Sequence, residues 1–195
     1  MTQTQLFILV AVCVLVAVAI GVVVSMRQQR TRKLRQKFGP EYGRAVARLG
    51  DRTKAEDELR ERQRRVSRLA IEPLAPADAA RFESAWKAVQ ARFVDDPAGT
   101  LADADDLIRK LMSQRGYPVG DFEVRAADVS VDHPRVVENY REAHAIALKH
   151  QRGETSTEEL RRALIHYRAL FDDLLEVRSE PPQAPAGHHI AGAKS

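Results

Sequence analysis

The chain has 195 residues, enough for one modest domain with short appendages, and 30% of its residues are charged, so most of it must face water. Its formal net charge of +4 is concentrated in residues 26–37, which hold six of the 31 basic residues and none of the 27 acidic ones, so the rest of the chain is slightly acidic. A nucleic-acid-binding domain needs a basic face on the folded protein, and this distribution argues against nucleic acid as a partner.

The first predicted element is a membrane-spanning helix over Leu6–Val24, within an anchor of residues 1–26. The segment is nineteen residues long and has no charged or amide side chain. At about 1.5 Å per residue it spans about 28 Å, close to the hydrocarbon thickness of a bilayer. A cleaved signal peptide would have basic residues before its apolar core, and here none precedes it. A lipoprotein signal would have a small residue before its cysteine, whereas Val12 precedes Cys13, the single cysteine. We therefore predict an uncleaved anchor.

Six basic residues follow the predicted span and none precedes it. Basic residues beside a span are retained on the cytoplasmic side, so we expect the N-terminus outside and residues 27–195 in the cytoplasm. The same side chains are in position to contact lipid headgroups of the bilayer. The six are Arg27, Arg30, Arg32, Lys33, Arg35 and Lys37. The small residues Ala17, Gly21 and Ser25 are spaced by four, which also permits self-association of the span.

Residues 27–70 are predicted to form a basic juxtamembrane helix and charged stalk helices. The basic helix continues the span to Phe38 and ends at Gly39–Pro40. Residues 52–69 carry many charges and few apolar side chains, a pattern typical of a solvated helix or of one paired with another helix. Its arginines could instead bind an acidic partner. Three acid–base pairs spaced by four residues support this helix, namely Glu56–Arg60, Glu58–Arg62 and Glu61–Arg65.

Residues 71–176 are predicted to form a small helical bundle, and residues 177–195 a disordered tail. Four amphipathic helices have start signals at Pro76, Asp96–Pro97, Pro134 and Ser156–Glu159. The first of these helices has one apolar face, formed by Phe82, Trp86, Val89 and Phe93. No segment shows sustained strand-like alternation. The predicted fold class is therefore all-α, with a transmembrane helix, charged stalk helices and a bundle.

The chain has no motif for catalysis, metal binding or cofactor binding, and we predict no cofactor. One feature is unusual, a connection over residues 117–133, since bundle helices are usually joined by about 2–8 residues. It contains a short predicted helix over 122–127 and mixes apolar with acidic side chains, as protein interfaces do. The candidate partner surface consists of Tyr117, Asp121, Phe122, Glu123, Asp128, Asp132 and His133.

Two interpretations of these polar residues stay open. Asp132 and His133 stand before Pro134, where a carboxylate and an imidazole could perform acid–base chemistry, or where either could cap the following helix. His144 lies on an apolar stripe and is interpreted as a core residue.

Three segments carry a resemblance to known proteins, namely Arg115–Glu123, Asp132–Tyr140 and His166–Phe171. With them, the chain after Phe38 resembles a family of uncharacterised bacterial proteins that pair an N-terminal membrane anchor with a small helical domain. The resemblance implies a single-pass protein of the bacterial inner membrane. It implies no activity, cofactor or functional residue.

Two hypotheses of function follow. The first is a cytoplasmic-face interaction or scaffold module that is held at the membrane and binds a protein partner. The second is a small enzyme or ligand-binding domain that uses the 117–133 connection. A pocket formed by Asp128, Asp132, His133 and Tyr140 would favour the second.

Overall fold

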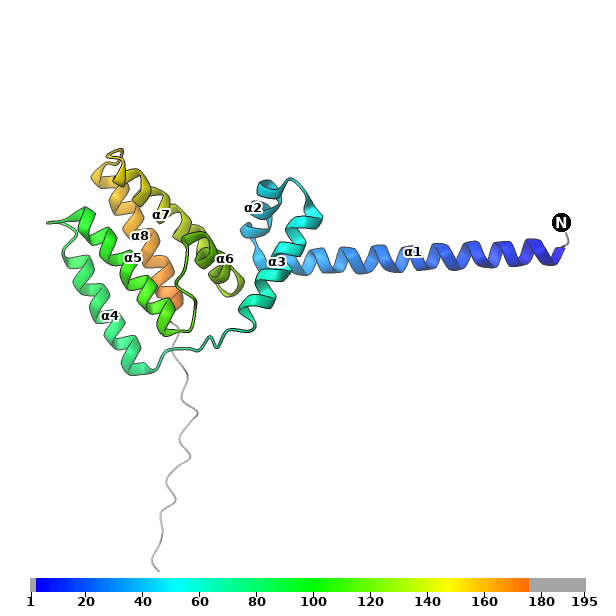
Figure 1. Cartoon of the computed structure of the whole chain (residues 1–195), viewed down its shortest axis with the longest axis horizontal. Coiled ribbons are helices and arrows are strands. Elements are labelled where there is room, and N and C mark those ends of the chain that lie inside the picture. The colour runs from blue at the N-terminus through cyan, green and yellow to red at the C-terminus, as the bar shows by residue number, and fades with distance from the viewer. Residues whose placement is uncertain (1–2, 176–195) are drawn as a thin grey trace, which may run out of the picture.

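A computed structural model describes residues 3–175, apart from the side chains of residues 4–14. Within this part of the chain every regular element is a helix, which confirms the predicted all-α class (Figure 1). The eight helices of the described part are α1 (Gln3–Phe38), α2 (Pro40–Leu49), α3 (Arg52–Val66), α4 (Pro76–Ala91), α5 (Pro97–Gln114), α6 (Phe122–Asp132), α7 (Val137–Gln151) and α8 (Thr157–Leu174).

The larger of two hydrophobic cores lies within the predicted bundle. Its long helices lie side by side in the order α4, α5, α8, α7 (Figure 1). Trp86 of α4 stacks on Phe171 of α8 with ring centroids 4.6 Å apart, and both side chains are fully buried. Tyr140 and Tyr167 are buried in the same core. The apolar faces predicted for these helices therefore meet one another.

The smaller core joins the C-terminal end of α1 to α2 and α3. Leu34 and Phe38 of α1 are buried against Tyr42 of α2 and Leu59 of α3. The chain reverses between α1 and α2 at Gly39, whose φ of +50° lies in the left-handed region that favours glycine.

Helix α3 is packed on its neighbours, which agrees with the predicted alternative of a helix paired with another helix and not with a fully solvated one. Its few apolar residues are spaced by four and seven, so they share one face, and that face is covered by α1, α2 and α6. The buried residues of α3 are Ala55, Glu56, Leu59, Arg62 and Val66.

Helix α6 contributes to both cores. Ala126 and Val129 are buried in the larger core, and Val131 is buried in the smaller one. The helix is capped by Asp121, which accepts a hydrogen bond from the backbone N–H of Glu123 at 2.8 Å. It runs five residues beyond its predicted end, because both of its faces are covered by other helices. One helix thus joins the smaller core, formed by α1, α2 and α3, to the bundle.

Most helix boundaries follow local signals. Asp96 caps α5 by accepting from the N–H of Gly99 at 2.8 Å, and Ser156 and Glu159 form the predicted capping box of α8. Pro134 is an exception. Helix α7 begins three residues after it, and the N–H groups of Val136 and Val137 both donate to the carbonyl of His133 in an intervening turn.

The apolar part of α1 projects away from the folded helices (Figure 1). Among the residues whose side chains are described, no helix is both long enough and apolar enough to cross a membrane. Residues 6–14 of the predicted span lie outside those residues.

We expect Trp86→Ala to lower the free energy of unfolding by about 3–5 kcal/mol, because the ring leaves a large cavity beside Phe171. Chemical denaturation of the full chain in detergent, followed by circular dichroism, measures this loss. Lys87→Ala changes the exposed neighbour and should cost less than about 0.5 kcal/mol. A loss below about 1 kcal/mol for Trp86→Ala would contradict the central position of the ring.

Candidate functional site

The seven residues predicted as a partner surface are divided between the protein interior and the solvent. Tyr117 is 3% exposed, and its hydroxyl donates to the Asp132 carboxylate at 3.0 Å. His133 ends α6, and its Nδ1 is paired with Asp173 of α8. These three residues therefore fasten the C-terminal end of α6 to the bundle. Neither Asp132 nor His133 caps α7.

The other four predicted residues lie along α6. Asp121 is the exposed N-cap, and the exposed Glu123 accepts from Arg141 of α7 at 2.6 Å. Phe122 is half-buried and stacks on His144 with ring centroids 3.6 Å apart. Asp128 is 1% exposed and faces α3. His144 is only half-buried and lines a surface pocket, so it lies at the edge of the core rather than inside it, and partial burial lowers the pKa of its imidazole.

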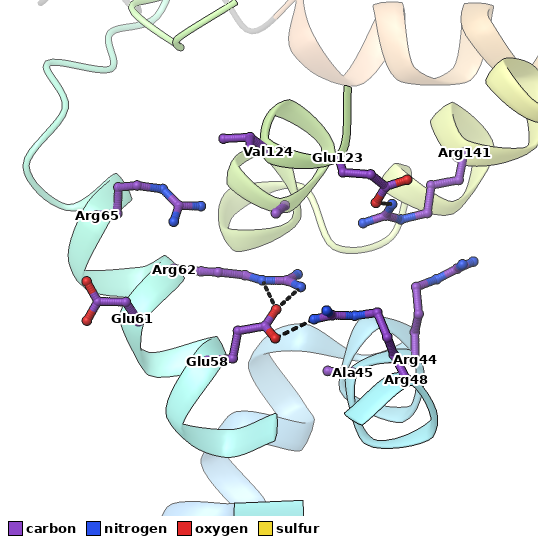
Figure 2. A pocket seen from close by; sticks show the side chains of 11 residues that line it. Arg44, Ala45, Arg48, Glu58, Glu61, Arg62, Arg65, Glu123, Val124 and Arg141 are labelled. Atoms are coloured by element: carbon purple, nitrogen blue, oxygen red, sulfur yellow. Dashed lines mark hydrogen bonds and ion pairs between the residues drawn. The ribbon is translucent and has the colours of Figure 1, made fainter. Parts of the chain in front are cut away.

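An arginine-lined cleft of about 430 Å³ lies where α2 and α3 meet α6 and α7 (Figure 2). Helix α3 supplies one wall, α2 another, and the first turns of α6 with Arg141 of α7 close the third. Its charged lining residues are Arg44, Arg48, Glu58, Glu61, Arg62, Arg65, Glu123 and Arg141. Sequence reasoning missed this site, since its residues come from segments up to a hundred positions apart.

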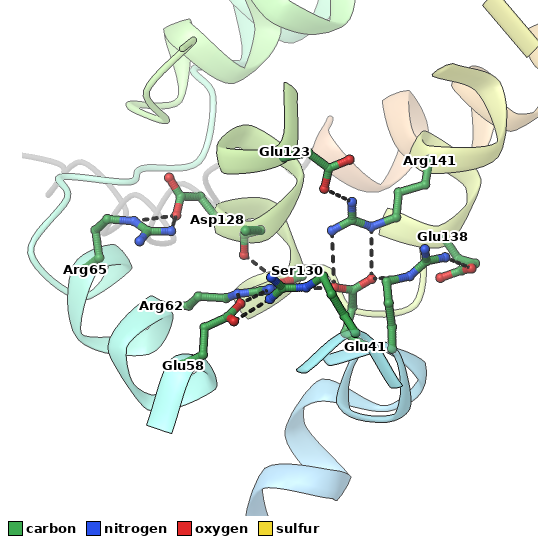
Figure 3. Close-up of polar contacts among 12 residues, drawn as sticks. Glu41, Glu58, Arg62, Arg65, Glu123, Asp128, Ser130, Glu138 and Arg141 are labelled. Atoms are coloured by element: carbon green, nitrogen blue, oxygen red, sulfur yellow. Dashed lines mark hydrogen bonds and ion pairs between the residues drawn. The ribbon is translucent and has the colours of Figure 1, made fainter. Parts of the chain in front are cut away.

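The buried carboxylate of Glu41 lies at the centre of the ion pairs behind this cleft (Figure 3). It accepts from Arg62 of α3 at 3.3 Å and from Arg141 of α7 at 3.1 and 3.3 Å. Arg44, one turn along α2, approaches it at 3.3 Å. Glu41 is 1% exposed, so these arginines replace the water that its charge would otherwise require.

A second link joins α3 directly to α6. Arg65 donates through Nε and Nη2 to one oxygen of Asp128, at 2.8 and 2.5 Å (Figure 3). Of the three acid–base pairs predicted within α3, Glu56–Arg60 and Glu58–Arg62 are present. The pair Glu61–Arg65 is absent among the described contacts, because Arg65 turns to the buried carboxylate of Asp128 instead.

Two carboxylates on α3, those of Glu56 and Glu58, have a pKa below the usual value. Burial opposes ionisation of Glu58, but hydrogen bonds from Arg62 and Arg48 outweigh it and hold the pKa of this carboxyl below its usual value. The same balance lowers the pKa of Glu56, which is buried but accepts hydrogen bonds from Thr31, Tyr42 and Arg52.

Charged side chains make up most of the lining of the cleft. Its polar side chains are arginines, which stay protonated, and glutamates, and it contains no serine, cysteine or histidine. The described residues contain no cluster of side chains suited to a metal ion. No protein-family model, no curated protein and no solved structure matches the chain. The geometry alone therefore bears on function.

We expect Glu41→Gln to lower the free energy of unfolding by about 3 kcal/mol or more, because Arg62 and Arg141 lose the charge that compensates their burial. Thermal and chemical denaturation measure the loss. Glu61→Gln is the matched control, since Glu61 is 63% exposed and its contact with Arg64 spans 3.8 Å. Equal effects of the two substitutions would show that the buried ion pairs do not hold the two parts together.

Proposed function

We propose that this protein is a membrane-anchored helical interaction module whose bundle is held on the cytoplasmic face of the bacterial inner membrane. The observation that carries the proposal is the continuity of α1. This helix of 36 residues begins in the apolar segment and ends in the smaller core, with no break between them.

The exposed apolar surface of α1 supports the anchor. Seven large apolar side chains between Leu15 and Val24 are 46–70% exposed. Each fully buried side chain of this size gains roughly 1.5–3 kcal/mol over exposure to water, so a continuous apolar helix requires a covering. Residues 6–14 extend the same apolar sequence toward the N-terminus. A lipid bilayer is the covering that fits a run of this length.

The other end of α1 supports a fixed position of the bundle. Thr31 is 7%, Leu34 7% and Phe38 0% exposed, so the helix is packed into the folded part from about two turns after Val24 onward. Fourteen residues separate Val24 from Phe38, a rise of about 21 Å along the helix. The domain is therefore held close to the membrane without a flexible linker. This suits a scaffold that presents its binding surface at a fixed distance from the bilayer.

A partner surface is proposed at the exposed rim beside α6. Val119 and Val124 are 48% and 46% exposed, and Val124 also lines the arginine-lined cleft. Exposed acids, Asp121 and Glu123, flank them. Apolar side chains within a charged rim are a common composition of protein interfaces. Self-association through α1 remains an alternative to a separate protein partner.

The competing hypothesis of a small enzyme or ligand-binding domain needs four side chains to share one space. Asp128 is paired with Arg65, and Asp132 accepts from Tyr117. His133 contacts Asp173, and the hydroxyl of Tyr140 accepts from Arg125 at 2.6 Å within the core. This divergence favours the interaction module.

We expect a C-terminal fluorescent-protein fusion to be bright and a C-terminal alkaline-phosphatase fusion to be inactive, because the six basic residues after Val24 hold residues 27–195 in the cytoplasm. Replacing these six by Gln, together with Gln3→Lys and Gln5→Lys, should raise phosphatase activity. An active phosphatase on the unmodified chain would overturn the orientation, and a protein that stays in the supernatant after carbonate extraction of membranes would overturn the anchor.

We expect Val119→Ser/Val124→Ser to weaken capture of a co-purifying protein while leaving the melting temperature almost unchanged, since both side chains are exposed. Quantitative mass spectrometry of material cross-linked in membranes compares the variants. Val94→Ser is the control, because Val94 is 86% exposed and lies at the α4–α5 connection, away from α6. Equal capture by both variants would place recognition elsewhere.

A further inference from the structure

A second charged groove, of about 420 Å³, lies between α1 and the N-terminal half of α3. Val24, the last residue of the apolar run, lines one end of it. Its charged lining residues are Arg27 and Arg30 of α1 and Arg52, Glu56 and Arg60 of α3. The groove therefore combines residues about thirty positions apart, and it exists only because α3 packs back against α1.

The groove has a formal excess of three positive charges, because four arginines face one glutamate. Glu56 is 9% exposed and is already engaged. It accepts from Thr31 at 2.8 Å, from Tyr42 at 3.0 Å and from Arg60 at 3.1 Å. The carboxylate of Glu56 therefore already has its hydrogen-bond partners within the protein. The groove keeps an excess of positive charge from its arginines.

Three of the four arginines of the groove keep donors available for a ligand, whereas both terminal nitrogens of Arg60 are engaged, with Asp57 at 2.6 Å and with Glu56 at 3.1 Å. Arg27 and Arg30 have no side-chain hydrogen bond or ion pair among the described residues. Arg52 uses its Nε toward Tyr42 and Glu56, while its two terminal nitrogens make no such contact within the described part of the chain. Free guanidinium donors of this kind bind phosphate oxygens well.

The position of the groove selects the source of that phosphate. Arg27 and Arg30 follow Val24 by three and six residues, a rise of about 4.5 and 9 Å along the helix. The headgroup layer of a bilayer begins where the hydrocarbon ends and is about 5–8 Å deep. Given the anchor proposed above, the groove opens at the depth of the lipid phosphates.

We propose that the groove between α1 and α3 binds the phosphate headgroup of an anionic phospholipid. The proposal rests on membrane insertion of α1 and adds a specific lipid site formed by two helices. Arg27 and Arg30 of α1 line one side of this site, and Arg52 and Arg60 of α3 line the other. The excess positive charge disfavours lipids whose headgroup carries an ammonium group, so phosphatidylglycerol or cardiolipin should be preferred over phosphatidylcholine.

The test uses the full chain in phosphatidylcholine nanodiscs with increasing phosphatidylglycerol, and lipids retained after mild detergent extraction are measured by native mass spectrometry. Arg27→Gln/Arg30→Gln should lower retention of phosphatidylglycerol at least about ten-fold, because each basic side chain near the membrane surface strengthens the binding of an anionic lipid. These two side chains have no partner to lose among the described residues, so the fold is left intact. Arg52→Gln/Arg60→Gln should give a comparable loss, and because both side chains also donate to the buried Glu56, circular dichroism of this variant must show an unchanged helix content for the loss to count.

Two matched controls remove the same charge outside the groove. Arg32→Gln/Lys37→Gln changes α1, and Arg64→Gln/Arg68→Gln changes residues beyond Arg60 along the chain. Both should change retention less than about two-fold, since none of these four side chains lines the groove and exposed charges are screened by salt. Equal losses for groove and control variants would overturn a specific site and leave general attraction to the surface.

Three further outcomes distinguish a lipid phosphate from a soluble one, and the membrane anchor from the lipid site. Retention that is abolished by millimolar inorganic phosphate would overturn the lipid assignment in favour of a soluble phosphate. A chain that fails to enter phosphatidylcholine vesicles in flotation would overturn the anchor. A chain that inserts but retains phosphatidylcholine and phosphatidylglycerol equally would overturn the lipid site alone.

Discussion

A carboxylate with almost no access to water requires charged partners, and Glu41 obtains them from two different parts of the chain. Arg62 comes from α3, which packs against α1, and Arg141 comes from the bundle, a hundred residues away. Buried ion pairs of this kind often add little net stability, since their desolvation is costly, but a change that separates them leaves an uncompensated charge. The ion pairs of Glu41 therefore fix the arrangement of the two parts mainly because any other arrangement would leave a buried charge unpaired. The net stability that the ion pairs add is a smaller contribution.

Helix α6 makes the same connection with apolar side chains. Its residues enter both cores, and Asp128 meets Arg65 on the face between them. Two attachments at different places resist rotation better than one. This explains why a connection that is long for a bundle contains a helix of eleven residues rather than an irregular loop. Its polar residues, including Tyr117 and Asp132, mainly fasten that helix.

The sequence predicted what depends on neighbours along the chain. Three predicted features need only a few adjacent residues to be recognised, and all three are present. They are the Asp96 cap, the Ser156–Glu159 capping box and the apolar face of α4 that contains Trp86. The predicted pair of Arg65 with Glu61 did not form among the described residues, because Asp128 of α6 competes for the same guanidinium group. An exposed pair within one helix contributes about 0.3–0.5 kcal/mol, and a buried carboxylate from another helix outcompetes it. The cleft at Glu41 depended on contacts across a hundred residues, for which a single sequence has no signal. The anchor and the partner surface stay predictions.

Helix α1 also has a mechanical consequence. A transmembrane helix changes its tilt when the thickness of the surrounding bilayer changes. A flexible tether after a span would absorb such a motion, whereas here Leu34 and Phe38 fix the same helix in the folded part. With the proposed anchor in place, α1 acts as a stiff lever whose pivot lies at the membrane surface. A few degrees of tilt would swing the rim beside α6 toward or away from the lipids, so the local composition and thickness of the membrane could govern which partners reach it.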